Sequence, residues 1–213
     1  MSILSYGPAR GTDARPGLEG RLAFHNPSRV WHNHGVTRNR QRQPRPPLDE
    51  EGLERLALFY AGRYATTRAK LRAYLARKVR ERGWVGTAPA PVERLVERLS
   101  ELRYVDDSAF ATAKAASLLR RGYGERRLGQ ALNAAGVEEA DAGPVRETAR
   151  EGALEAALRY AERRRFGPYA EGAADRPARE KAAAAMLRAG HRMDVVRRVL
   201  NAKPGEIPEL DGS

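Results

Sequence analysis

Residues 102–111 read LRYVDDSAFA, and the segment RRGYG follows at 120–124. The aromatic Tyr104 and the hydrophobic Val105 close one helical unit, and Phe110 and Ala111 begin a new buried stripe. The stretch joins the end of one helical unit to the start of a second unit that repeats its pattern. The stretch therefore predicts a structural junction between two helical units.

The two carboxylates of this stretch, Asp106 and Asp107, lie where the second unit begins. The first N–H groups of a helix are unpaired and its dipole is positive there, so a helix start favours a capping side chain and negative charge. A carboxylate pair is also a candidate for metal ligation or acid–base catalysis. No third acidic residue lies at a useful spacing, so we expect a structural role and no metal site.

Helical spacing continues on both sides of the junction, and Asp49 and Thr66 or Thr67 are candidate helix caps. Before the junction, the hydrophobic positions at helical spacing are Leu53, Leu56, Ala57, Tyr60, Tyr64, Leu71, Leu75, Val79, Val92, Leu95, Val96, Leu99 and Leu102. Alternating β-branched or aromatic runs are absent from the sequence. The pattern predicts an all-α fold.

The helical pattern repeats along the chain. Residues Leu128, Leu132, Gly136 and Val137 reappear 54 positions later as Ala182, Met186, Gly190 and His191. In the other direction Leu71 and Leu75 lie 57 positions before Leu128 and Leu132, and Gly83-Trp84 lies 53 before Gly136-Val137. Each unit thus has a helix that stops at a glycine, which can adopt the left-handed cap conformation.

These offsets divide the chain into three tandem three-helix repeats between two flanking segments. The expected boundaries are 1–47 for a disordered basic tail, 48–104, 105–149 and 150–203 for the repeats, and 204–213 for a disordered C-terminus. Units that contact mainly their neighbours form an elongated, curved, solenoid-like body.

Composition points to an anionic partner. The 213 residues carry a formal net charge of +12 and no cysteine, which excludes disulfides and thiolate metal sites. No hydrophobic run has the ~20 residues of a membrane span, and no signal-peptide core is present, so we expect a soluble cytoplasmic protein without a membrane partner. Half of the charge excess lies in residues 1–47, with eight arginines against two acidic residues. That tail either helps to bind a polyanion, or is an extended or wrongly assigned N-terminal segment without function.

Basic residues recur in all three units, and we expect those of two segments to form the binding surface; unit three carries Arg163, Arg164, Arg165, Arg179, Lys181, Arg188 and Arg192. The candidate binding residues are Arg68, Lys70, Arg72, Arg77 and Lys78 in the helix expected at 67–82, and Arg120, Arg121, Arg126 and Arg127 around the glycines of the second repeat. A solvated charged face is the alternative interpretation.

Catalysis has little support. The sequence has no phosphate-binding loop, dinucleotide fingerprint or nucleophile elbow. His191, which the repeat pattern places at a packing position, is the one histidine between 48 and 203. We expect no enzyme activity, no catalytic residue and no cofactor.

Several of these motifs, in this order, resemble the RecX family, the bacterial regulators of RecA recombinase. The similar segments are 49–64, YVDDSAFA at 104–111, RRGYG at 120–124, the pattern from Leu128 to Val137, and FGPY at 166–169 with the final helices. The family commonly has glycine where this chain has Arg103, lysine where it has Ala135, and an aromatic residue where it has His191.

The resemblance implies a modulator, mainly an inhibitor, of RecA. Such proteins lie in the groove of the RecA–single-stranded DNA filament and limit ATP hydrolysis, strand exchange and filament growth, within DNA repair and the SOS response. It also implies a monomer whose partners are the RecA filament and single-stranded DNA, contacted directly or through RecA. Two alternatives stay open: a helix-turn-helix protein that binds DNA without RecA, and a structural adaptor for other proteins.

Overall fold

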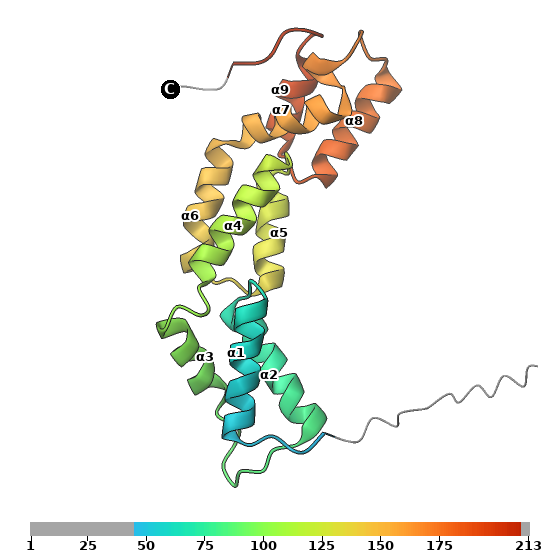
Figure 1. Cartoon of the computed structure of the whole chain (residues 1–213). Helices are drawn as coiled ribbons and strands as arrows, with labels where there is room; N and C mark the ends of the chain where they lie inside the picture. Colours follow the sequence, from blue (N-terminus) through green and yellow to red (C-terminus); the bar gives the residue numbers. More distant parts are fainter. Residues whose placement is uncertain (1–44, 210–213) are drawn as a thin grey trace, which may run out of the picture. The chain divides into compact units, whose positions relative to one another are not determined.

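The computed structural model describes residues 45–209, which fold into nine α-helices and one 3₁₀ turn (Figure 1). Within this range, the β-structure consists of one isolated bridge between Leu48 and Trp84. The predicted all-α class is therefore confirmed. Residues 1–44 of the expected tail lie outside the described residues.

The first three helices form a bundle with its own hydrophobic core. They are α1 (Glu50–Arg63), α2 (Arg68–Arg82) and α3 (Val92–Glu101). Asp49 caps α1 by accepting a hydrogen bond from the Gly52 N–H at 2.8 Å, and Thr67 caps α2 by accepting from the Lys70 N–H at 3.2 Å. Both are local effects of residues that satisfy unpaired first-turn donors. The buried core comprises Leu48, Leu53, Ala57, Leu71, Leu75, Leu95, Val96, Leu99 and Val105.

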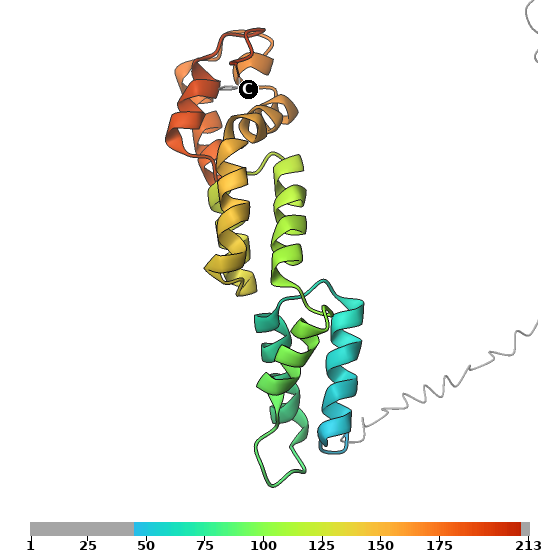
Figure 2. The same cartoon turned by 90° about the vertical axis from the view of Figure 1, so that its left-hand side faces the viewer.

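The second bundle contains α4 (Asp107–Arg120), α5 (Glu125–Ala135) and α6 (Glu139–Glu151). Helices α4 and α6 lie side by side (Figure 2). Leu128 and Leu132 are fully buried in its core, Leu118 is 7% exposed, and most of the other buried members are alanines. Because α6 runs to Glu151, the expected boundary between 149 and 150 was wrong: it falls inside a helix.

The third bundle contains α7 (Ala153–Arg164), a 3₁₀ turn at Gly167–Tyr169, α8 (Arg176–Arg188) and α9 (Met193–Asn201). Residues 204–209, expected to belong to a disordered terminus, are hydrogen-bonded to this bundle. The Gly205 N–H donates to the Pro168 carbonyl at 2.8 Å, and Arg198 donates to the Glu209 carbonyl at 2.5 Å. Gly205 and Glu209, within the segment expected to be disordered, thus have hydrogen-bond partners on the third bundle.

The glycine stops are confirmed. Gly83, Gly136 and Gly190 follow the second helix of each bundle with φ of 83°, 69° and 93°. A side chain at these angles would be strained, which explains why glycine recurs at this position of each repeat.

The sequence offsets recur in the contacts between bundles. The Thr67 hydroxyl donates to the Ala135 carbonyl at 2.6 Å, and the Gly124 N–H donates to the Ala189 carbonyl at 3.0 Å. Thr67 and Gly124 are 57 positions apart, and Ala135 and Ala189 are 54 apart, as in the repeat. The start of each second helix therefore binds the end of the second helix in the next bundle, where the negative end of one helix dipole meets the positive end of the other.

Candidate nucleic-acid interface

Asp106 starts α4 as predicted. Its carboxylate accepts the Ala109 N–H at 2.9 Å and forms an ion pair with Arg103 at 2.7 Å. These interactions, the Ala109 hydrogen bond first, lower the pKa of the Asp106 carboxyl from its ordinary value. Arg103 has a left-handed φ of 61°, which residues other than glycine rarely adopt.

Asp107 has a different role, which the sequence did not reveal. Its side chain is 2% exposed, accepts the Arg68 N–H at 2.9 Å and lies 3.4 Å from the Arg68 guanidinium. Arg68 also contacts Asp141 at 3.1 Å and Glu138 at 3.8 Å. Three carboxylates surround one guanidinium, so Arg68 connects the first bundle to the second.

Three of the other four cations predicted on α2 form ion pairs. Arg72 pairs with Glu93 of α3 at 2.7 Å, while Arg77 and Lys78 share Glu81 at 3.5 and 2.5 Å. The hydrogen bond from Lys78 is the main cause that lowers the pKa of the Glu81 carboxyl. The charge of α2 is therefore partly neutralised by an acidic residue on another helix, which helical spacing could not reveal.

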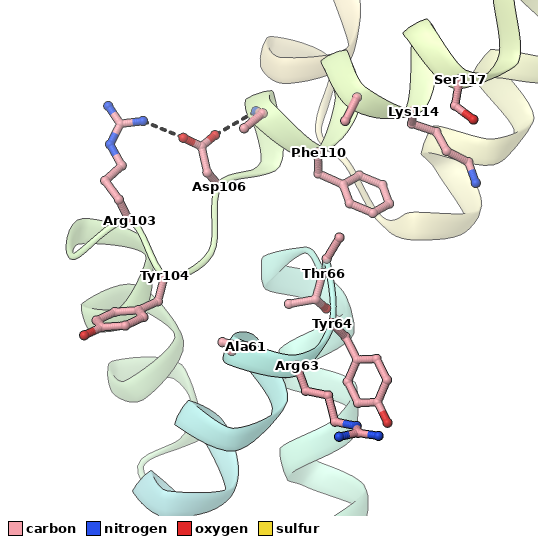
Figure 3. A pocket seen from close by; sticks show the side chains of 14 residues that line it. Ala61, Arg63, Tyr64, Thr66, Arg103, Tyr104, Asp106, Phe110, Lys114 and Ser117 are labelled. Atoms are coloured by element: carbon pink, nitrogen blue, oxygen red, sulfur yellow. Dashed lines mark hydrogen bonds and ion pairs between the residues drawn. The ribbon is translucent and has the colours of Figure 1, made fainter. Parts of the chain in front are cut away.

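A cavity of about 590 Å³ lies beside the junction of the first two bundles (Figure 3). Phe110 of α4 and Tyr64, which follows α1, line it, and Lys114 and Arg63 place cationic groups on its wall. The Lys70 ammonium lies 4.7 Å from the centre of the Phe110 ring. Rings beside cations suit a partner group that is flat or apolar and carries negative charge nearby.

Tyr104 lines the same cavity and is 56% exposed. Of the two residues expected to close the first unit, Val105 is 2% exposed and lies in its core, whereas Tyr104 does not pack there. Lys114 also lines this cavity, although it was not among the predicted binding residues. Its spacing of four from Phe110, which places both on one helix face, was the available signal.

The second predicted basic segment differs from α2. Arg120, Arg121, Arg126 and Arg127 are all exposed, and none forms an ion pair with a residue in the range 45–209. The guanidinium carbons of Arg121 and Arg127 lie 5.1 and 5.9 Å from the centre of the Tyr123 ring. Such cations are available for phosphate or carboxylate groups of a partner.

The described part of the chain contains neither a metal-binding cluster nor a helix that could cross a membrane. Residues 45–209 contain no group of three or more His, Asp or Glu side chains arranged to hold a metal. None of the helices from α1 to α9 combines the length and apolar character needed to cross a membrane.

Comparisons with known proteins point to one family, although no family model matches the chain. The chain is 33% identical over 180 residues to the regulatory protein RecX of Myxococcus xanthus, covering 80% of this chain and 96% of the relative. It is 30% identical over 159 residues to the regulatory protein RecX of Agrobacterium fabrum, covering 72% of this chain and 84% of that protein. The crystal structure of RecX from Lactobacillus salivarius shares the fold, with a TM-score of 0.58 at 16% identity over 71% of this chain and 94% of that one. With a relative matched over nearly its full length, the chain belongs to the RecX family of regulatory proteins.

Proposed function

We propose that this protein modulates RecA recombinase, mainly as an inhibitor. It binds in the groove of the RecA–single-stranded DNA filament and limits ATP hydrolysis, strand exchange and filament growth, and so regulates DNA repair and the SOS response. Membership in the RecX family supports the regulatory role. We further propose that it acts as a monomer, since three bundles on one chain can contact neighbouring RecA protomers at high effective concentration.

One observation carries the proposal for how it binds. Arg121, Arg126 and Arg127 lack ion-pair partners among residues 45–209, whereas Arg68 and Arg72 have them. A cation that is already paired gains less from a new anion, because the old pair must be broken first. We therefore assign the larger share of filament binding to the segment at 120–127 and a smaller share to α2.

The test is a titration of the purified chain into RecA on single-stranded DNA, with the rate of ATP hydrolysis as the readout. We expect the wild-type chain to lower that rate. The variant R121Q/R126Q/R127Q should need a several-fold higher concentration for the same inhibition, and R72Q/K78Q should show a smaller change.

The matched control is R55Q/R94Q/R176Q. These three arginines are exposed and paired with Glu51, Glu50 and Glu180, and their loss removes the same charge. If R121Q/R126Q/R127Q inhibits ATP hydrolysis by RecA at the same concentration as the wild type, these three arginines are not part of the interface. A wild-type chain that leaves RecA unaffected but binds duplex DNA tightly would instead favour the helix-turn-helix alternative.

A further inference from the structure

Three arginines from three helices converge on a small cavity where the second and third bundles meet. The cavity has a volume of about 230 Å³. Arg127 of α5, Arg164 of α7 and Arg188 of α8 line it together with Tyr123 and Tyr160. Two of these arginines come from the last bundle, so the cluster extends beyond the basic segment at 120–127.

Tyrosine rings support two of the three guanidinium groups. Arg127 lies 5.9 Å from the centre of the Tyr123 ring, and Arg164 lies 5.2 Å from the centre of the Tyr160 ring. Tyr160 is itself buried, and its hydroxyl donates to the Ala185 carbonyl at 3.3 Å. A cation held over a fixed ring loses less conformational freedom when it binds an anion.

The cluster has no counter-charge in the described part of the chain. None of its three arginines forms an ion pair there, although the nearby Arg159 pairs with Glu155 and Arg165 with Glu171. Like charges gathered at one cavity repel each other, so an anion that neutralises them is favoured. The arrangement contrasts with Arg68, whose surrounding carboxylates already neutralise it.

We propose that Arg127, Arg164 and Arg188 bind phosphate groups of a single-stranded DNA backbone at the joint between the second and third bundles. This names the ligand of the basic surface in the proposed function and rests on that function for its biological setting. Guanidinium groups match phosphate oxygens in planar, two-pronged hydrogen bonds. Successive phosphates of a DNA strand can each bind one of the three exposed arginines, whereas a single carboxylate side chain has only one negative charge for all three.

Binding there also affects the joint itself. The N–H groups of Gly124 and Arg126 donate to the carbonyls of Ala189 and Gly190 at 3.0 and 3.1 Å, across the two bundles. A phosphate bound by Arg127 on one side and by Arg164 or Arg188 on the other adds a second connection. The DNA strand should therefore slow the opening of these backbone hydrogen bonds.

The experiment measures binding of labelled oligothymidine by fluorescence anisotropy, with the full chain and without RecA, over a series of salt concentrations. Each phosphate contact contributes about 0.7 to the slope of log K against log salt for a single strand, so R127Q/R164Q/R188Q should lower that slope by about 2. The control R55Q/R94Q/R176Q removes the same charge and should leave the slope nearly unchanged. Equal slopes for the wild type and R127Q/R164Q/R188Q, or equal losses in both variants, would overturn the proposal.

Two further measurements distinguish a DNA-strand site from a free-phosphate site and test the effect of binding on the joint. Inorganic phosphate should displace the strand only slightly better than chloride at equal ionic strength, because a single ion replaces only part of the contacts that a strand makes. Complete displacement by phosphate, with no change of slope in the variant, would assign the cavity to free phosphate and overturn the strand site. Hydrogen exchange at Gly124 and Arg126 should slow when oligothymidine binds the wild type but not R164Q/R188Q. Because neither arm uses RecA, a failure here is distinct from a failure to inhibit RecA.

Discussion

The Asp107 carboxylate accepts the backbone N–H of Arg68 at 2.9 Å and lies 3.4 Å from the guanidinium of the same residue. The two residues are 39 positions apart, and they connect the first helix of the second bundle to the second helix of the first. One carboxylate therefore satisfies a helix-start donor and a half-buried cation together. Asp107 and Arg68 hold these two bundles in contact, so we expect them to matter for stability more than for binding.

Substitution of Asp107 by alanine should lower the free energy of unfolding by about 2–3 kcal/mol, because it leaves the Arg68 backbone donor without its acceptor and removes one of the three carboxylates around the Arg68 guanidinium. Asp106→Ala, next to it, removes a helix cap and should lower it by about 1 kcal/mol. Urea unfolding followed by circular dichroism measures both. An equal or larger loss for Asp106→Ala would show that the contact between bundles adds little.

Thr66 and Thr67 provide a second matched pair. Thr67 caps α2 and donates to the Ala135 carbonyl, so Thr67→Val should lower the free energy of unfolding by about 2 kcal/mol. The Thr66 hydroxyl is buried without a hydrogen-bond partner, so Thr66→Val should be neutral or stabilising. Thermal unfolding of the two variants side by side checks the order, and a greater loss for Thr66→Val would contradict it.

Substitution of Gly190 by alanine tests how tight the contact between the second and third bundles is. A Cβ at Gly190 would lie 2.4 Å from the backbone nitrogen of Arg127, and the residue has φ of 93°. Gly205 has a similar φ of 85° but open space around it, so Gly205→Ala should cost the backbone strain alone, about 1–2 kcal/mol. Gly190→Ala should cost at least about twice as much, because the clash with backbone adds to the same strain. Similar losses in urea unfolding would show that this contact relaxes easily.

The buried ring of His191 should make the stability of the protein depend on pH. Its Nε2 lies 3.0 Å from the Gly122 carbonyl, and burial lowers the pKa of the ring below the ordinary 6.5, opposed by that hydrogen bond. The unfolded chain then binds the proton more readily than the folded one. The stability that the neutral ring contributes is fully present above about pH 6.5 and is lost as the pH falls through the lowered pKa of the folded state.

The melting temperature of the wild type should therefore fall between about pH 7 and about pH 5, and that of His191→Gln should change less over this range. Differential scanning calorimetry of both proteins in the same buffers measures the difference. Parallel curves for the two proteins would assign the pH dependence to other groups.

Much of the fold could be predicted because its causes are local. The caps at Asp49, Thr67 and Asp106 depend on donors within one helical turn, and the glycine stops depend on a single backbone angle. The offsets of 54 and 57 positions also survive into the structure, where Thr67–Ala135 and Gly124–Ala189 form corresponding contacts. The hydrogen bonds of Gly205 and Glu209 to the third bundle could not be predicted, because the sequence does not show which backbone groups find partners on a neighbouring surface.

The sequence by itself determined the all-α class, the tandem repeats and the helix starts, because hydrophobic spacing, capping and glycine stops act over a few residues. Only the tertiary structure decided which charges remain available. Arg68 and Arg72 are neutralised by Asp107 and Glu93, which lie on other helices, while Arg127, Arg164 and Arg188 converge without a carboxylate. An ion pair depends on the distance between side chains in space, and the crossing of helices far apart in the chain sets that distance.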